Sequence, residues 1–378
     1  MKGSSLYFEK LMLRSDLFRV KVLGISLAAL AIFVNCSAPA AQVALPATAT
    51  APAVELALPT PAPTAVPSAT PTRLPTLRPT ATASPTFTPE PTATPEPTAC
   101  ACDIEQVVII SIDGLRPDAL ELAETPFLDA LRAVGAYSDK AQTVLPSVTL
   151  VNHASMLSGV GPEKHQIIWN EINLSLGIIE VPTLFSLAHE AGLSTAMVVG
   201  KPKFEHLVIP GSVDDYYYAG FTDSQVVKQA VQVIEAGLPH LLFIHLPDVD
   251  SAGHLTGWMS PGQLAAIALT DSQVGKVVSA LEANGELETS LLIITADHGG
   301  HDRLHGSDLP EDMTIPWLAV GPGIPAGMTI ESDIVIYDTA ATALHALGLT
   351  VPSSWDGRPV PDIFNDLPES SSSRKEGE

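Results

Sequence analysis

Short runs of aliphatic residues alternate with amphipathic stretches between residues 103 and 366. The aliphatic runs predict buried strands, at Gln106–Ile112, Ser194–Val199, Leu241–Leu246, Leu291–Thr295 and Pro316–Val320. Helical periodicity predicts helices between them, at Pro126–Val134, Thr183–Ala191, Ser224–Ala236, Pro261–Ala283 and Asp338–Leu347. This alternation predicts an α/β fold with a doubly wound, mostly parallel central sheet and helices on both faces.

Residues 1–36 follow a different pattern, in which basic residues precede an uninterrupted apolar run from Val22 to Val34. The run is shorter than the roughly 20 residues of a membrane span and is typical of an export signal. Cys36 follows it where bacterial lipoproteins carry their lipid, although Asn35 stands where that motif prefers a small residue. We expect attachment to a membrane or envelope through the N-terminus, with a lipid on Cys36. An uncleaved anchor and simple secretion are the alternatives, and each places the remaining chain outside the cytoplasm.

Proline and threonine dominate residues 37–99, in repeats such as PTATPEPT. Proline removes backbone donors and few side chains here can form a core, so we predict a disordered stalk over residues 37–102. At about 3.1 Å per residue the stalk reaches up to roughly 200 Å. Cys100 and Cys102 close it without the spacing of a redox motif. Residues 367–378 are predicted to form a disordered tail.

The charge balance restricts the function. The 378 residues include 19 basic and 42 acidic side chains, with a net charge of -23. This balance excludes a basic face for nucleic-acid phosphates, but an anionic substrate stays possible because a metal supplies local positive charge. With only 3 cysteines, the domain depends on a hydrophobic core rather than on a disulfide scaffold.

Acidic and histidine side chains follow three of the predicted strands. VVIISID ends at Asp113, LLFIHLPDVDSAGH runs on through Asp250 to His254, and LLIITADHGG contains Asp297 and His298. The carboxyl ends of strands in a doubly wound sheet meet at one crevice, so we expect these groups to converge there, with His305 close by. Their combined negative charge calls for one or two divalent cations, and mixed Asp/His ligands suit zinc. The alternative is that each group only caps a helix or begins a turn.

Several motifs around these residues resemble the alkaline phosphatase superfamily, in its type I phosphodiesterase and nucleotide pyrophosphatase branch. They are IDGLRPD, LPSVTLVNHASMLSG, GPEKHQIIWN, DVDSAGH, TADHGG and LHG, from Asp113 to His305 in the family's order. The resemblance implies an alkaline-phosphatase-like catalytic domain over residues 103–366, with two divalent metal ions per chain, Zn²⁺ being the expected metal. It also implies an enzyme that hydrolyses phosphoric esters of small molecules.

The resemblance assigns roles to single residues of this chain. Thr149 stands at the position of the threonine nucleophile, and Asn170 at that of the asparagine that holds a phosphoryl oxygen. The ligands of the first metal correspond to Asp250, His254 and His305. Those of the second metal correspond to Asp113, Asp297, His298 and Thr149.

Two positions depart from the family's pattern, which often has proline at Val151 and glycine at Gln166. We interpret both as packing positions that leave the chemistry intact. We expect His153 to orient the nucleophile segment rather than to bind a metal.

The expected chemistry follows from the nucleophile. A threonine hydroxyl attacks poorly at neutral pH, and a divalent cation lowers its pKa. A helix predicted over Val151–Leu157 would bring its N-terminus to Thr149, where it favours negative charge. We expect a phosphothreonine intermediate that water hydrolyses. The structural alternatives are a helix cap for Thr149 and a turn position for Asn170.

Lys201 and Lys203 indicate which class of phosphoric ester the protein would cleave. Relatives that cleave phosphate monoesters or phosphonates often have Lys-x-Lys or Lys-x-Arg here, and extra cations favour a dianion. A monoester or phosphonate substrate is therefore one expectation, and a phosphodiesterase or nucleotide pyrophosphatase is the alternative. Phe204–Phe221 is the largest candidate for a cap over the site, and we expect its Tyr216-Tyr217-Tyr218 run to pack against the core rather than to stack on a substrate.

Three other classes of function compete with this hypothesis. An inactive surface-displayed binding protein would be expected to lack a ligand or the nucleophile, and the full set occurs here. A sulfatase needs a cysteine or serine within a distinct motif, and the cysteines lie far from the predicted site. A phosphotransferase is compatible with the residues, because a phosphothreonine can pass its phosphoryl group to another alcohol.

Overall fold

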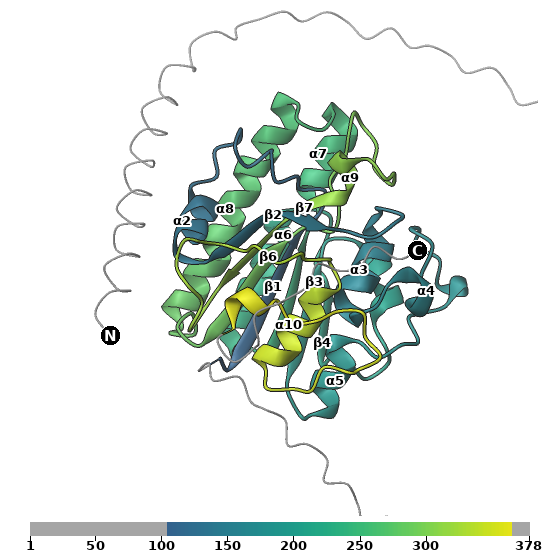
Figure 1. Cartoon of the computed structure of the whole chain (residues 1–378), viewed down its shortest axis with the longest axis vertical. Coiled ribbons are helices and arrows are strands. Elements are labelled where there is room, and N and C mark those ends of the chain that lie inside the picture. Colours follow the sequence, from purple (N-terminus) through teal and green to yellow (C-terminus); the bar gives the residue numbers. More distant parts are fainter. Residues whose placement is uncertain (1–103, 365–378) are drawn as a thin grey trace, which may run out of the picture. The chain divides into compact units, whose positions relative to one another are not determined.

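The computed structural model describes residues 104–364, which Figure 1 draws as a coloured ribbon. The predicted export segment at residues 1–36 with Cys36, the predicted stalk at residues 37–102 and the predicted tail at residues 367–378 lie outside the described residues.

Within residues 104–364, one sheet of eight strands has the order β4-β3-β5-β1-β6-β7-β2-β8. The strands are β1 (Gln106–Ile112), β2 (Ala136–Gln142), β3 (Thr195–Val199), β4 (Asp215–Tyr218), β5 (Leu241–Leu246), β6 (Ser290–Thr295), β7 (Thr314–Val320) and β8 (Met328–Thr329). The strands from β4 to β6 in this order are parallel, whereas β7 is antiparallel to both β6 and β2. The predicted α/β class with a mostly parallel sheet is confirmed.

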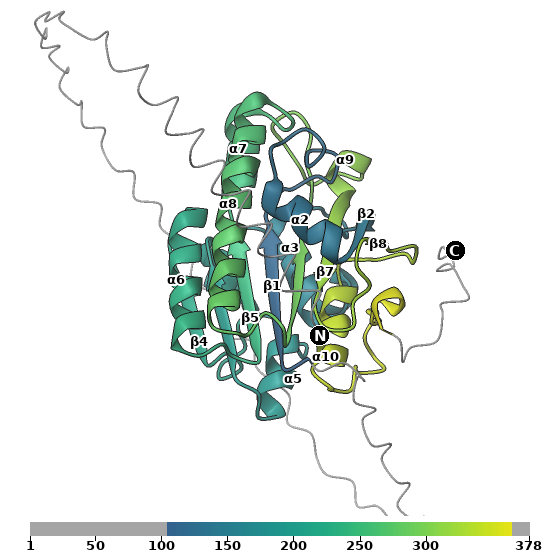
Figure 2. The same ribbon diagram turned by 90° about the vertical axis from the view of Figure 1, so that its left-hand side faces the viewer.

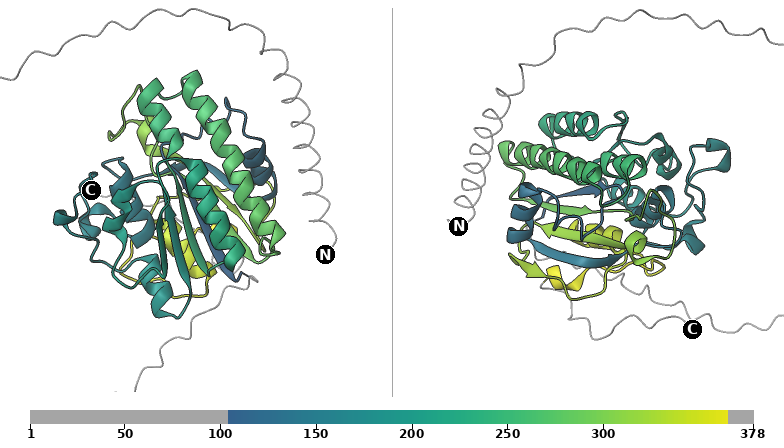
Figure 3. Two further views of the ribbon diagram at one scale, coloured as in Figure 1. Left: turned by 180° about the vertical axis from the view of Figure 1, so that it is seen from behind. Right: turned by 90° about the horizontal axis from the view of Figure 1, so that it is seen from above.

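Helices cover both faces of the sheet, as Figures 2 and 3 show. On one face α2 (Pro126–Val134) and α6 (Asp223–Ala236) pack against α8 (Pro261–Ala283), and on the other α3 (Thr149–Ser158) and α5 (Leu184–Glu190) pack against α10 (Asp338–Ala346). The shorter helical elements are α4 (Pro162–His165), α7 (Asp248–Thr256), α9 (Pro310–Met313), η1 (Leu174–Leu176), η2 (Pro202–Leu207) and η3 (Pro361–Ile363). Because helices cover both faces, β5 and β6 are buried at every residue, which explains their continuous aliphatic runs.

Helix α8 has 23 residues and is apolar enough to cross a membrane by length and composition. In the described part of the chain, however, 50% of its apolar window is buried, and it packs against α2, α6 and α7. This burial is what a core helix of the α/β layer requires.

One local expectation was wrong and another holds only in part. The segment Phe204–Phe221 is no separate cap, because it contributes to η2 and then forms the edge strand β4, paired in parallel with β3. The tyrosine run lies in β4, where Tyr216 and Tyr217 are partly buried and Tyr218 is 36% exposed, so packing against the core is only partial.

The two departures from the family's pattern have different explanations. Val151 is completely buried, as its interpretation as a packing position requires. Gln166 is exposed and ends α4 with a φ of 60°, a left-handed conformation that favours glycine. Packing therefore does not explain Gln166, and backbone conformation explains why glycine suits this position.

The chain after β5 forms a helix rather than a longer strand. It leaves the sheet after Leu246, turns at Pro247 and enters α7 at Asp248. Asp250 and His254 therefore lie one helical turn apart on the same face of α7. The D-x-x-x-H spacing thus places a carboxylate beside an imidazole.

Candidate active site

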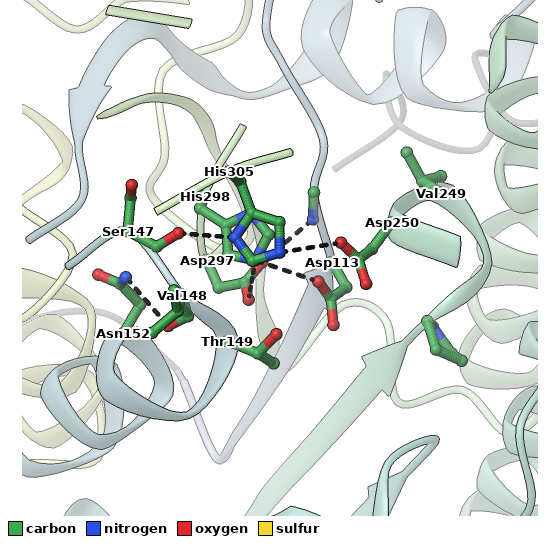
Figure 4. A network of polar contacts seen from close by, with 12 residues as sticks. Asp113, Ser147, Val148, Thr149, Asn152, Val249, Asp250, Asp297, His298 and His305 are labelled. Carbon is green, nitrogen blue, oxygen red and sulfur yellow. Dashed lines mark hydrogen bonds and ion pairs between the residues drawn. The ribbon is translucent and has the colours of Figure 1, made fainter. Parts of the chain in front are cut away.

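The predicted ligands meet at the carboxyl ends of β1, β5 and β6. Asp113 follows β1, and Asp297 and His298 follow β6. Nε2 of His298 lies 3.5 Å from Oδ1 of Asp113 and 3.3 Å from Oδ2 of Asp297. All three side chains are completely buried, and Figure 4 shows them pointing toward one another. The predicted ligands of the second metal, other than Thr149, thus form one compact group.

The other group of predicted ligands lies closer to solvent. Oδ1 of Asp250 is 3.3 Å from Nε2 of His254 and 3.6 Å from Nε2 of His305, and these two nitrogens are 3.2 Å apart. The His254 side chain is 44% exposed, whereas that of His305 is only 8% exposed. The rings of His298 and His305 stack with centroids 3.8 Å apart. The two groups are therefore adjacent, and one of them opens to solvent.

Each of the three carboxylates has one oxygen held by the protein and one left free. Asp113 Oδ2 accepts from His245 and Lys201, Asp250 Oδ2 accepts from Lys201, and Asp297 Oδ1 accepts from the Gly114 N–H. The remaining oxygens, Asp113 Oδ1, Asp250 Oδ1 and Asp297 Oδ2, are buried without a hydrogen-bond partner among the described residues. Buried polar atoms without partners are costly, so these oxygens fit a cation that would bind them.

The three histidines of the groups are oriented in the same way. Each Nδ1 lies 2.8 to 2.9 Å from a backbone carbonyl oxygen. The carbonyls belong to Arg303 for His254, Gly299 for His298 and Ser147 for His305. A carbonyl only accepts, so Nδ1 carries the proton and the Nε2 lone pair faces the carboxylates. This arrangement is the one that histidine ligands of metals require, and the mixed Asp/His donors fit zinc or a similar ion in each group.

The charges of the site are strongly coupled. Burial alone would raise the pKa of Asp113, but Lys201 and His245 outweigh it and hold that pKa well below its usual range. Burial and the nearby Asp113 raise the pKa of Asp297 well above its usual range. Burial followed by the influence of His298 lowers the pKa of His305 to about 4. Opposite shifts on neighbouring carboxyls are typical of functional sites.

Thr149 lies beside these groups at the first position of α3. It is buried, and Val148 rather than Thr149 occupies the cap position of the helix. His153 Nδ1 lies 2.7 Å from the Thr149 carbonyl oxygen, and its Nε2 lies 2.8 Å from Ser111 Oγ. His153 thus fixes the backbone of Thr149, as expected, and the structural alternative of a capping Thr149 has no support.

The predicted phosphoryl-binding residues also reach this place. Lys201 Nζ lies 2.6 Å from Asp113 Oδ2, 2.7 Å from Asp250 Oδ2 and 3.4 Å from Thr149 Oγ1. Asn170 Oδ1 accepts from the Leu150 N–H at 3.0 Å and from Lys203 Nζ at 3.0 Å. Lys201 and Lys203 are therefore parts of the site rather than solvated lysines at a strand end.

His245 is a buried polar residue of the site that sequence reasoning missed. It lies within β5, is completely buried, and contacts Asp113 Oδ2 at 2.9 Å. The available signal was a single imidazole inside an aliphatic strand, since buried polar side chains need partners. His301 and Asp248 lie outside the ligand groups. His301 pairs with Asp312 at 2.7 Å, and the backbone N–H groups of Asp248 and Asp223 each donate to the carboxylate of the other residue.

Known proteins are similar to this chain in sequence. The family model described as type I phosphodiesterase / nucleotide pyrophosphatase matches residues 107–305. Ectonucleotide pyrophosphatase/phosphodiesterase family member 3 of Rattus norvegicus is 26% identical over 219 residues, covering 52% of this chain and 25% of its own length. Venom phosphodiesterase 2 of Crotalus adamanteus is 25% identical over 230 residues, covering 53% of this chain and 28% of its own length. This chain thus spans about a quarter of the length of these curated relatives.

Solved structures share the fold. Murine ectonucleotide pyrophosphatase / phosphodiesterase 5, in an inactive form in complex with AMP, superposes with a TM-score of 0.58 at 18% identity, covering 66% of this chain and 96% of that one. The phosphonate monoester hydrolase from Silicibacter pomeroyi has a TM-score of 0.55 at 17% identity, covering 70% of this chain and 78% of that one. Because the family model covers more than half of the 378 residues and the fold agrees, the chain belongs to the type I phosphodiesterase / nucleotide pyrophosphatase family of the alkaline phosphatase superfamily.

Proposed function

We propose that this chain is an extracytoplasmic hydrolase of phosphoric esters that uses Thr149 as its nucleophile and two divalent cations, Zn²⁺ foremost, as cofactors. The observation that carries the proposal is the convergence of unpartnered carboxylate oxygens and imidazole Nε2 atoms beside Thr149. The export signal predicted at residues 1–36 supports the location.

The residues divide the reaction between them. Thr149 Oγ1 attacks the phosphorus atom, the bond to the leaving alcohol breaks, and the resulting phosphothreonine is hydrolysed by water. When bound, the cations lower the pKa of the attacking hydroxyl and offset the charge of the phosphoryl group. Two donors already occupy Asn170 Oδ1, so its amide Nδ2 is the atom available to a phosphoryl oxygen. Thr149 begins α3, and the helix N-terminus favours the negative charge that gathers there.

Lys201 and Lys203 favour a dianionic substrate within this class. Their Nζ atoms contact Asp113, Asp250 and Asn170, so both charges lie where a phosphoryl group would bind. A phosphate monoester or phosphonate dianion carries one more negative charge than a diester, and charge-assisted contacts are stronger for it. We therefore propose a preference for phosphate monoesters or phosphonates.

A phosphodiesterase or nucleotide pyrophosphatase activity is the second candidate. Family membership favours it, because the curated relatives named above carry these activities in their names. The lysine contacts are the observation that separates the two candidates. Cleavage of a diester at least as efficiently as the matched monoester would favour this second candidate.

Paired substrates test the proposal directly. The purified full chain is assayed with an aryl phosphate monoester and the matched aryl diester, first with zinc and then after chelation. We expect zinc-dependent hydrolysis that chelation abolishes and added zinc restores, with the monoester preferred. Full activity in a verified metal-free sample would contradict the two-metal mechanism. The absence of turnover on both substrates would instead favour an inactive binding protein.

A further inference from the structure

His245 bonds to two different parts of the site through its two ring nitrogens. Its Nε2 lies 2.9 Å from Asp113 Oδ2, and its Nδ1 accepts the Gly200 N–H at 3.3 Å. His245 belongs to β5, which lies between β1 and β3 in the sheet, and its side chain is completely buried. One side chain thus links the end of β1, which carries a predicted metal ligand, to the end of β3, where Gly200 and Lys201 follow the strand.

The backbone contact fixes the tautomer of the ring. An amide N–H is always a donor, so Nδ1 of His245 must be the unprotonated acceptor. Nε2 therefore carries the proton and donates it to the Asp113 carboxylate. Complete burial lowers the pKa of His245, which is consistent with a neutral ring. This tautomer is the opposite of that of His254, His298 and His305, whose Nδ1 atoms carry the proton.

The bonds donated by His245 and Lys201 together decide which oxygen of Asp113 is free. His245 and Lys201 both donate to Oδ2, and Oδ1, 3.5 Å from His298 Nε2, has no hydrogen-bond partner within residues 104–364. A carboxylate without the His245 bond would rotate more freely about its terminal torsion, and either oxygen could then face the cation. Partners of this kind set the orientation and the affinity of metal ligands.

The acceptor nitrogen fixes the turn that presents Lys201. Gly200 directly precedes Lys201, and its N–H points at His245 Nδ1. A Cβ at Gly200 would lie 2.5 Å from the ring of Pro247, so the turn is also packed tightly against the end of β5. The position of the lysine and the orientation of the carboxylate therefore depend on the same imidazole.

We propose that His245 is a positioning residue that orients Asp113 for the metal and holds the Lys201 turn beside it. The proposal rests on the proposed function for the metal, but the tautomer and the two hydrogen bonds are properties of the protein alone. Ring packing is the competing explanation, because the rings of Phe204 and His153 lie 4.5 and 5.1 Å from that of His245.

Three substitutions separate hydrogen bonding from packing. The side-chain amide of His245→Gln places an N–H donor near the position of Nε2. The shorter amide of His245→Asn extends only to the position of Nδ1. His245→Phe keeps an aromatic ring of similar position but has neither nitrogen. Zinc affinity of the full-length variants is measured by competition with a chromogenic chelator, with no substrate present. We expect His245→Asn and His245→Phe to weaken zinc binding by about 10- to 100-fold and His245→Gln to stay within about threefold of the parent.

The proposal stays testable if a variant fails to fold, because the tautomer is measured in the parent without any substitution. Equal zinc affinity in the parent and the Asn variant, or equal loss in the Asn and Gln variants, would overturn the positioning role. The tautomer is checked separately in the metal-free parent by two-bond ¹H–¹⁵N NMR, where we expect a protonated Nε2 and an unprotonated Nδ1. A protonated Nδ1 would overturn the proposal without reference to zinc. A parent that keeps the predicted tautomer but neither binds zinc nor cleaves phosphoric esters would count against the proposed function instead.

Discussion

Lys201 Nζ lies 3.4 Å from Thr149 Oγ1, and the same ammonium group lies within 2.7 Å of both Asp113 and Asp250. One fixed cation thus touches the proposed nucleophile and a carboxylate from each ligand group. Burial alone would lower the pKa of Lys201, but the two aspartates outweigh it and raise the pKa above its usual value. The lysine is therefore charged throughout the working range of pH, and its charge is available to a phosphoryl group bound between the same residues.

Removing both lysine charges should alter specificity. We expect Lys201→Ala with Lys203→Ala to depress turnover of an aryl phosphate monoester much more than that of the matched diester. Each charge-assisted contact contributes roughly 1.5–3 kcal/mol, about tenfold or more in rate if it forms in the transition state. The ratio of kcat/KM values measures the effect, with the exposed Lys276→Ala as a control. If kcat/KM falls equally for both substrates, the lysines stabilise bound anions without selecting between them. If kcat/KM falls for neither, the lysines do not act on the substrate and the diesterase assignment is favoured.

Lys203 predicts a pH dependence. Burial, followed by repulsion from Lys201, lowers its pKa from 10.5 to about 8. A lysine is charged below its pKa, so its contribution to binding a dianion is present below about pH 8 and is lost as the pH rises through that value. We expect kcat/KM of the parent for a monoester to fall as the pH rises above about 8, which gives the pH profile an alkaline limb. In Lys203→Arg, whose side chain stays charged, this fall should be much smaller. An unchanged limb in the arginine variant would exclude Lys203 as its origin.

Bound zinc should stabilise the fold. A ligand that binds only the folded state adds about 2.7 kcal/mol at a concentration of 100 times its Kd. The parent should therefore show a melting temperature raised by several degrees in zinc, and Asp297→Asn should show a much smaller rise because a buried ligand oxygen is lost. Thermal unfolding with and without zinc measures both, with Glu288→Gln, an exposed carboxylate on the surface, as the matched control. A zinc-induced rise of the same size in Asp297→Asn and the parent would place the metal elsewhere.

The hydroxyl of Thr149 should be indispensable. We expect Thr149→Ala to lose several orders of magnitude in kcat, whereas Thr149→Ser, which keeps a hydroxyl, should stay within about tenfold of the parent. Circular dichroism and thermal unfolding check that the alanine variant is folded. Residual activity of Thr149→Ala within tenfold of the parent would show that the nucleophile has been misplaced.

The buried strands could be predicted because helices cover both faces of the sheet. β1, β5 and β6 therefore needed nearly continuous aliphatic residues, which are visible in the sequence. β2 has the sequence AYSDKAQ with exposed and buried positions mixed, so its period gave no clear signal. The direction of β7 also could not be predicted, because a short apolar run looks the same in parallel and antiparallel pairing.

For the candidate site, too, some features could be predicted from the sequence and others could not. The strand-end positions of Asp113, Asp297 and His298, together with motif spacing, predicted which residues would meet. The sequence carries no sign of which oxygen or ring nitrogen faces inward, because most of the groups that fix those orientations lie far away along the chain, such as the Ser147 carbonyl for His305 and the Arg303 carbonyl for His254. His245 shows the limit most clearly, since its partners Asp113 and Gly200 are brought to it only by the order of strands in the sheet.

The central claim is that a phosphoryl group is transferred to Thr149. The direct measurement is to quench the full-length protein with acid during turnover of an aryl phosphate monoester and to analyse its peptides by mass spectrometry. The account predicts a phosphorylated peptide with the phosphate on Thr149, formed at least as fast as turnover and absent from Thr149→Ala. Turnover with no phosphopeptide in a sample quenched faster than the intermediate decays, or with the phosphate on another residue, would contradict the account.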